Sequence, residues 1–342
     1  MNATCRHGEH TWDVHAHHLP YSAVPLLADG LAAVSMGEVN GIADSIMVNG
    51  MAVGATTHQL GDIEGLVAAT DAAGLDKRVM SPPPFTYRYW DDPEATLALH
   101  RLLNDATAEL VEAHPDRFVG LATIPIQDPA LAVAELRRAH DELGLIGVTI
   151  GTNVAGGNIA DEVRRPVLAE ASDRRFPVLV HPDFVPNPRW STHYLINLIG
   201  MPVDTAIAMG TLIFSGCMAE YTDLRVCFLH GGGAAPYLFG RWDKGWKVRP
   251  ESRLHIDSPP TLHLDRIFCD TLTHSPEALS YLVEVLGAAN VVVGTDCPFD
   301  VEDPDPLGTL DAAPRLDDDE RETIRSVSPV RWLTGTEAPE VL

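Results

Sequence analysis

The sequence predicts an α/β fold, a (β/α)8 barrel of the TIM type, with a small β insertion after the first strand and long loops after strands five and six. Three observations predict this fold. The chain has 342 residues, and 45% of them are apolar, so it is long and apolar enough to bury the core of one barrel with insertions. Short runs of β-branched residues recur along the chain, and stretches with apolar residues at helical spacing separate them. Strands that alternate with helices build a parallel sheet, and eight such units close a barrel.

The eight predicted strands are short and apolar, as expected of parallel strands that helices cover. In chain order they span residues 11–17, 78–83, 118–123, 146–151, 178–181, 225–230, 267–270 and 291–296. Amphipathic stretches that predict helices lie between them, at residues 63–73, 95–113, 130–143, 163–175, 202–215 and 278–286.

Three connections are longer than a minimal strand-to-helix loop. Gly and Asn residues between 40 and 50 predict turns, so we expect residues 19–61 to form a small β insertion over the barrel mouth. Residues 183–201 and 239–264 form the loops after the fifth and sixth strands, and long ordered loops on a barrel are usually functional. No break in composition divides residues 1–342, which we expect to form one domain that ends in a helix and tail over residues 320–342.

The charge and cysteine content exclude several classes of protein. With 24 Lys and Arg against 48 Asp and Glu, the formal net charge is -24, which repels nucleic acid and anionic membrane surfaces. Five scattered cysteines form no disulfide framework and predict reduced thiols. We find no signal peptide and no apolar run long enough to cross a bilayer, so we expect a cytoplasmic enzyme that acts on a small molecule.

Two histidines occupy alternate positions at the end of the first predicted strand. In His15-Ala16-His17 both imidazoles point to the same face, because alternate residues of a strand share a face. Such a pair is suited to holding one metal ion, although a His-x-His pair alone is often only structural.

Three further polar residues end other predicted strands. His181 ends the fifth strand, His230 the sixth and Asp296 the eighth. The C-terminal ends of all strands meet at one mouth of a barrel, so these side chains should converge with His15 and His17. Each alone would be an ordinary polar residue, but five such residues on these strands predict one divalent metal ion per subunit. Imidazole and carboxylate ligands suit Zn²⁺, which we take as the first choice, and also Mn²⁺ or Fe²⁺.

One of the five has a second interpretation. His230 begins the run His230-Gly231-Gly232-Gly233, whose glycines allow close approach of a ligand to the backbone. A histidine there is suited to general acid and base chemistry near neutral pH. Four aromatic or histidine residues that follow strand ends are predicted to line the substrate pocket, namely Phe85, Trp190, His193 and Phe299.

Four motifs together carry a family resemblance over nearly the whole chain. They are residues 13–17, His181-Pro182, residues 230–233 followed by Gly240-Arg241, and residues 294–299. With these motifs the chain resembles the decarboxylase branch of the amidohydrolase superfamily, the aminocarboxymuconate semialdehyde decarboxylase-like family. The resemblance implies that His15, His17, His181 and Asp296 hold the metal, and that His230 and Asp296 are catalytic. It also implies a homodimer in which Arg241, from its own or the neighbouring subunit, binds a carboxylate of the substrate.

The resemblance implies a metal-dependent, non-oxidative decarboxylase of a small aromatic or unsaturated carboxylic acid. Either His230 activates a water that adds to the substrate, or His230 or Asp296 protonates the carbon that bears the carboxylate. A hydrolase such as a lactonase, or a hydratase, on the same scaffold is the alternative, because a fold does not fix a chemistry. The chain departs from the family in having no Arg between residues 31 and 61, which argues against a dicarboxylate, and Cys297 after Asp296.

Overall fold

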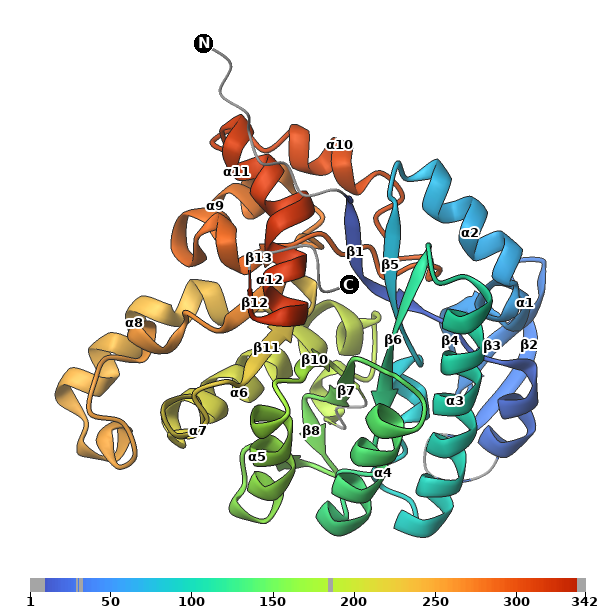
Figure 1. The fold of residues 1–342 in the computed structure, drawn as a ribbon, viewed down its shortest axis with the longest axis horizontal. Helices are drawn as coiled ribbons and strands as arrows, with labels where there is room; N and C mark the ends of the chain where they lie inside the picture. The colour runs from blue at the N-terminus through green and yellow to red at the C-terminus, as the bar shows by residue number, and fades with distance from the viewer. Residues whose placement is uncertain (1–9, 29, 31–32, 184–186, 337–342) are drawn as a thin grey trace.

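Eight parallel strands form the barrel that the sequence predicts. The computed structural model describes residues 10–28, 30, 33–183 and 187–336. In their order around the sheet, the strands are β1 (Trp12–His17), β5 (Lys77–Ser81), β6 (Phe118–Thr123), β7 (Gly147–Gly151), β10 (Pro177–His181), β11 (Arg225–Phe228), β12 (Ile267–Asp270) and β13 (Val291–Val292) (Figure 1). This order follows the chain, apart from the strands of two small side sheets, as it must in a simple (β/α)8 barrel.

The barrel closes between β13 and β1 through single backbone hydrogen bonds. The regular part of β13 is only two residues long, where the sequence predicts a strand over residues 291–296. Beyond it, the amide of Val14 donates to Val293, that of Asp296 to His15 and that of His17 to Cys297, each over 2.8 Å. The regular strand is therefore shorter than predicted, but the segment that follows it runs beside β1 and closes the barrel.

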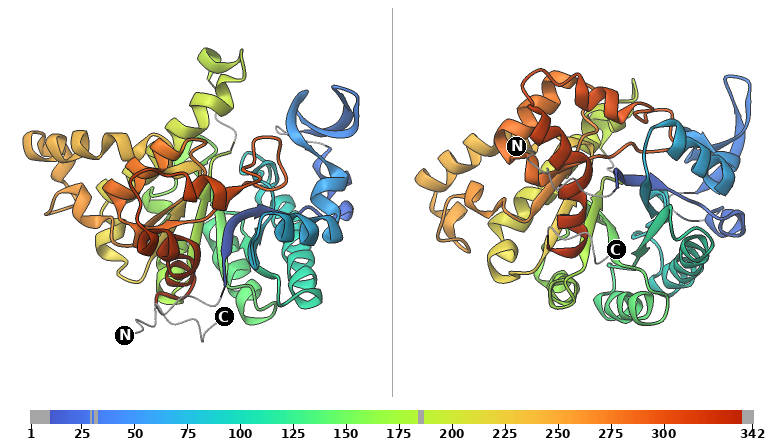
Figure 2. Two further views of the ribbon diagram at one scale, coloured as in Figure 1. Left: turned by 90° about the horizontal axis from the view of Figure 1, so that it is seen from above. Right: turned by 45° about the horizontal axis from the view of Figure 1, so that its top comes forward.

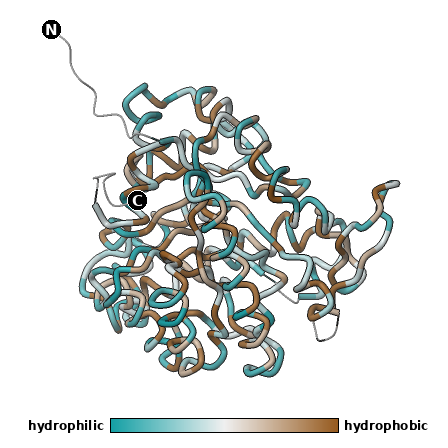
Figure 3. Tube along the Cα trace, turned by 45° about the vertical axis from the view of Figure 1, so that its right-hand side comes forward, coloured by the Kyte–Doolittle hydropathy of each residue, from teal (hydrophilic) through white to brown (hydrophobic). Residues whose placement is uncertain are grey.

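Helices cover the outside of the sheet close to the predicted ranges. They are α2 (Ile63–Ala72), α3 (Pro93–Ala113), α4 (Pro129–Asp141), α5 (Arg165–Asp173), α6 (Met201–Phe214), α8 (Ala235–Val248) and α9 (Pro276–Leu286). α3 shows why they begin where they do: Asp92 accepts a hydrogen bond from the amide of Ala95, and Pro93 occupies the first turn, where no amide is needed. Hydrophobic stretches gather in the barrel and hydrophilic ones lie outside (Figure 3).

The end of the barrel from which the strands start is closed by the end of the chain. The segments α11 (Asp318–Glu322), η10 (Thr323–Val327) and α12 (Ser328–Thr334) follow each other without a break, and of the predicted tail, residues 337–342 lie outside the described residues. Trp332 and Leu333 pack with Trp12, Leu179 and other side chains inside the barrel. The opposite end, where the strands finish, is left for the site.

A three-stranded antiparallel sheet follows η1 (Tyr21–Leu27), after the first strand. It consists of β2 (Val34–Val39), β3 (Ile42–Val48) and β4 (Met51–Thr56). Gly41 and Gly50 take up positive φ angles in the two turns, a conformation that costs glycine little. Figure 2 shows this insertion (blue) and the segment before α6 (yellow-green) rising on the same side, opposite the termini.

The two long loops differ from the prediction. The first contains the short helices η4 (Pro188–Trp190) and η5 (Ile196–Gly200), and its residues 184–186 lie outside the described residues. The second, predicted as a loop over residues 239–264, is helical up to Val248 because α8 extends through its first part, projecting from the barrel (Figure 1).

One stretch of the chain, Ile196–Phe214, is long and apolar enough to cross a membrane, contrary to the prediction. It consists of η5 and α6. About 44% of its most apolar part is buried inside the structure, where α6 packs in the hydrophobic core. One such helix is only weak evidence for a membrane span.

Four of the five cysteines are buried free thiols, as predicted, namely Cys217, Cys227, Cys269 and Cys297. Cys5 lies outside the described residues.

Candidate active site

β1 places two imidazoles side by side at the mouth of the barrel. Every residue of this strand is buried, and the alternation of its side chains directs His15 and His17 to the same face. Their ring centroids are 5.2 Å apart. His181, the last residue of β10, reaches the same point, with its ring centroid 5.1 Å from that of His15 and 5.2 Å from that of His17.

His230 and Asp296 join the cluster from turns rather than from strands, which corrects the prediction. β11 ends at Phe228, and His230 starts a short turn in which its φ is 56°. Asp296 has a φ of 66° in the extended segment after β13. Both residues thus adopt a left-handed conformation that is uncommon for residues other than glycine, and such conformations cluster at functional sites.

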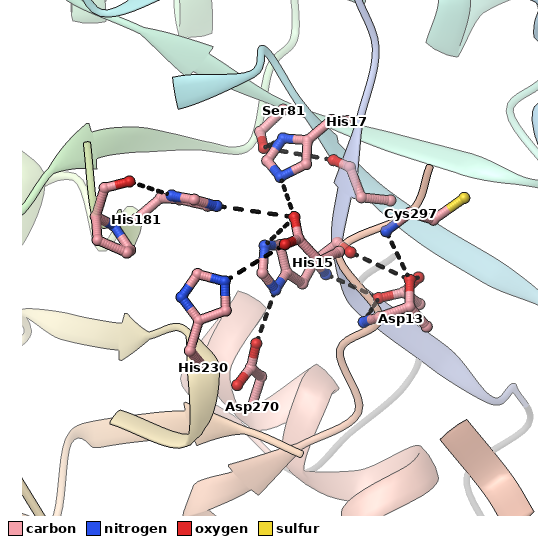
Figure 4. Close-up of polar contacts among 12 residues, drawn as sticks. Asp13, His15, His17, Ser81, His181, His230, Asp270 and Cys297 are labelled. Carbon is pink, nitrogen blue, oxygen red and sulfur yellow. Dashed lines mark hydrogen bonds and ion pairs between the residues drawn. The ribbon is translucent and has the colours of Figure 1, made fainter. Parts of the chain in front are cut away.

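The four imidazoles of His15, His17, His181 and His230 gather around one point (Figure 4), and the carboxylate of Asp296 lies within 4 Å of all four. Its Oδ1 is 3.1 Å from Nε2 of both His15 and His17, and 3.9 Å from Nε2 of His181. Its Oδ2 is 3.5 Å from Nε2 of His230. Ligand atoms of His15, His181, His230 and Asp296 all lie within 4.8 Å of one another, and His17 lies beside this set, hydrogen-bonded to Oδ1.

The residues present fit a divalent metal ion. Nε2 of His15 and Nε2 of His181 are buried and have no hydrogen-bond partner among the described residues, even though the first lies 3.1 Å from a carboxylate oxygen. Buried polar atoms are normally paired, and imidazole nitrogens aimed at a shared point beside a carboxylate are the donor set of a metal site. The site therefore supports a divalent metal.

The other ring nitrogens are fixed by acceptors outside the cluster. Nδ1 of His15 donates to Oδ2 of Asp270 over 2.8 Å, and Nδ1 of His181 donates to the carbonyl of Pro182 over 2.6 Å. Because the proton sits on Nδ1 in both rings, the lone pair of Nε2 faces the centre, as metal-binding histidines require. Asp270 was not among the predicted site residues, yet it ends the seventh strand, so the strand-end argument that found His181 would also have found it.

Burial and charge pull the pKa values in the cluster in opposite directions. Burial works against the charged form of His15, but the nearby Asp296 and Asp270 carboxylates outweigh it and raise its pKa to about 10. Burial lowers the pKa of His181 to about 3. Although burial opposes ionisation of Asp296, the charge of His15 and the hydrogen bond with His17 hold the pKa of Asp296 well below its usual value. The cluster thus places the ionised carboxylate of Asp296 beside a protonated His15 ring, and a bound metal cation would take the place of that proton.

A pocket opens from the cluster, and its walls are mostly apolar. His181, His230 and Asp296 line it at one side. Among the predicted substrate-binding residues, Phe85 and Phe299 line the pocket, and the Phe299 ring contacts His17 edge-on. The remaining walls come from the insertion, the loops after β5 and β10, the segment that leads into α6 and the Asp296 loop, through Val48, Met51, Ala52, Val53, Pro84, Asp183, Tyr194, Ile196, Asn197, Met201 and Val301.

Three predicted residues do not line this pocket. The ring of Trp190 lies against Gly200, and His193 is exposed, whereas its neighbour Tyr194 lines the pocket instead. Arg241 is exposed on α8 and not in a loop, so it does not serve its own subunit's pocket here. Among the described residues that line the pocket, there is no Lys or Arg. A cation for a substrate carboxylate must therefore come from elsewhere than these walls.

Comparison with known proteins gives a consistent result. The family described as Amidohydrolase matches residues 12–333. The chain is 37% identical over 238 residues to 2-amino-3-carboxymuconate-6-semialdehyde decarboxylase of Dictyostelium discoideum, covering 69% of this chain and 65% of that protein. It is 26% identical over 242 residues to 2-keto-4-carboxy-3-hexenedioate hydratase of a Sphingobium species, covering 68% of each. The solved structure of a dihydroxybenzoic acid decarboxylase from Polaromonas contains manganese and the inhibitor 2-nitroresorcinol. It superposes on this chain with a TM-score of 0.77 at 19% identity, over 97% of this chain and 99% of that one, and so shows the same fold.

Proposed function

Because the chain belongs to the amidohydrolase family, we propose that it is a metal-dependent decarboxylase that removes CO₂, without oxidation, from a small aromatic or unsaturated carboxylic acid. The observation that carries the proposal is the pair of unpartnered Nε2 atoms of His15 and His181 beside Asp296, at the base of an apolar pocket that His230 also lines. The decarboxylase among the relatives supports the reaction class.

His15, His17, His181 and Asp296 would hold one divalent ion, and Zn²⁺ is our first choice. Manganese, which the Polaromonas protein binds, is accepted by the same ligand types. When bound, the ion supplies a Lewis acid that polarises an oxygen of the substrate.

His230 is the proton carrier in this proposal. Its side chain is 19% exposed and borders the pocket, whereas His15 and His17 are fully buried. In decarboxylation the bond between the substrate carbon and its carboxyl group breaks, CO₂ leaves, and the electron pair remains on the carbon. That carbon then takes a proton, which His230 can deliver because its Nε2 faces the cluster, 3.5 Å from Asp296. The contact with Asp296 directs Nε2 of His230 toward the cluster at the base of the pocket.

The lining favours a substrate with one carboxylate and an uncharged remainder. Met51, Val53, Phe85, Phe299 and Val301 offer contact to an aromatic ring, and the acidic Asp183, which also lines the pocket, disfavours a second carboxylate. We propose that the first carboxylate is bound by Arg241 of the partner subunit in a homodimer. Arg241 is exposed, the nearby Asp243 accepts hydrogen bonds from Thr261, and the planar guanidinium of Arg241 fits a carboxylate.

A hydratase is the second candidate, and the Sphingobium relative favours it. The deciding experiment supplies the metal-loaded enzyme with a panel of hydroxybenzoic and unsaturated monocarboxylic acids, lactones and enoic acids. CO₂ release, absent in His230→Ala, supports the decarboxylase. Water addition or lactone opening without CO₂ would replace it with a hydratase or a hydrolase.

A further inference from the structure

Asp270 joins two parts of the site that lie far apart in the sequence. It ends β12, its side chain is fully buried, and its two oxygens point to different elements (Figure 4). Oδ2 accepts the Nδ1 proton of His15 over 2.8 Å, and Oδ1 accepts the amide proton of Gly231 over 2.6 Å. Gly231 directly follows His230, so one carboxylate holds both a ring of the metal cluster and the turn that carries the acid/base.

The His230 turn needs such support because its backbone is unusual. The φ angles of His230, Gly231, Gly232 and Gly233 are all positive, at 56°, 62°, 73° and 59°. A positive φ costs histidine free energy that the surroundings must offset. The carboxylate of Asp270 supplies a charge-assisted hydrogen bond to the amide in the middle of this turn, and such bonds are stronger than neutral ones.

The surrounding residues leave room for this arrangement and for little else. A Cβ atom on Gly294 would come within 2.7 Å of Cβ of Asp270 and 2.9 Å of Cβ of His15. Glycine at 294 therefore lets the Asp270 carboxylate approach the His15 ring. Asp13, a further buried carboxylate near His15, contacts instead the amides of His15 and Thr295, the hydroxyl of Thr295 and the guanidinium of Arg78, so it joins β1 to β5 and to the segment after β13.

We infer that Asp270 is a positioning residue that sets the ring of His15 for the metal and, through Gly231, the direction of His230. This inference rests on the proposed function for the role of His230, but both contacts of Asp270 are defined without it. An Asn at 270 has the same shape with one acceptor and one donor group, whereas both neighbours are donors. The Asp270→Asn variant must therefore lose one of the two hydrogen bonds and the negative charge that strengthens the other.

The experiment compares Asp270→Asn with a matched control, Asp265→Asn, which removes an exposed carboxylate paired with Arg266 just before the same strand. Two properties are measured that need no substrate: the Kd for Zn²⁺ and for Mn²⁺ by chelator competition, and the NMR resonances of the His230 ring. We expect Asp270→Asn to bind the ion about 10- to 100-fold more weakly, the usual effect of removing the partner of a ligand histidine, and to shift the His230 resonances. Asp265→Asn should change neither.

Each outcome is decisive. An unchanged Kd, or an unchanged His230 ring, would show that Asp270 does not link the two and would overturn the inference. If both change while no acid in the panel loses CO₂, the link stands and the proposed function fails. If Asp270→Asn does not fold, the parent protein still gives the answer: ¹⁵N NMR should show His15 with its proton on Nδ1 and a protected Gly231 amide, and the absence of either overturns the inference.

Discussion

Replacing His181 and His230 separately should distinguish a metal ligand from a proton carrier. His181 is 4% exposed, and its Nε2 has no partner other than the proposed ion. His181→Ala should therefore lose the metal and all activity. His230 is more exposed and its Nε2 lies 3.5 Å from Asp296, so the ring can be removed while His15, His17, His181 and Asp296 remain. His230→Ala should keep its metal and lose at least about a hundredfold in kcat, which corresponds to about 2.7 kcal/mol of transition-state stabilisation.

The assay combines metal analysis with kinetics on the same samples. Each variant is stripped, reloaded with one equivalent of Zn²⁺ or Mn²⁺ and passed through a desalting column, after which bound metal and kcat are measured. His100→Gln, a buried histidine on α3 outside the cluster, controls for the general effect of losing an imidazole. Equal metal loss in His181→Ala and His230→Ala would refute the reasoning, because His230 would then be a ligand first.

Three other predictions follow from the pocket, the protruding helix and a buried histidine. Met51 lines the pocket from the insertion, so Met51→Arg should allow a dicarboxylate to compete with a monocarboxylate. Met36→Arg, on the same small sheet but outside the pocket, should not. Competition assays with pairs of acids test this. Arg241→Ala should lower kcat/KM strongly with unchanged metal content and Tm, and if Arg241 acts in the partner subunit, mixing it with His230→Ala should restore part of the activity. Burial lowers the pKa of His100 to about 4, so as the pH falls below about 6.5 the unfolded chain takes up the proton before the folded protein does. The contribution of His100 should therefore lower the free energy of unfolding by about 1.4 kcal/mol per pH unit toward pH 4. Urea unfolding at pH 7 and pH 5 tests this, and His100→Gln should show a smaller difference between the two.

Seven of the eight barrel strands could be predicted to within two residues at each end, because buried β-branched runs are distinctive, whereas β13 ends four residues before its predicted end. The run at residues 225–230 continues with the apolar Leu229 past Phe228, and the three glycines that signal a turn begin only after His230, so the pattern places His230 on the strand. Residues 239–248, the larger part of α8, fall in a segment predicted as a loop, and Gly240 and Gly245 lower the helix propensity there. In the fold, Phe239 and Trp242 pack on the core cluster and decide the conformation, so tertiary contacts override the local signal.

The two site residues that lie outside the regular strands, His230 and Asp296, are the ones that complete the site. A strand end directs its side chain along one path into the mouth, as His15 and His181 show, and a cluster needs groups from other directions. His230 and Asp296 obtain those directions from left-handed turns, at a cost of roughly 1–3 kcal/mol each.

Backbone contacts hold these turns in place. The amide of Asp296 donates to the carbonyl of His15, and that of Gly233 donates to the carbonyl of His230. At Gly233 a Cβ atom would lie 2.3 Å from the carbonyl oxygen of Pro202, so the backbone itself excludes larger residues. Strain at the two reactive groups is therefore offset by contacts from neighbouring segments, and the geometry of the site depends on the closed barrel as well as on the glycines of the His230 turn.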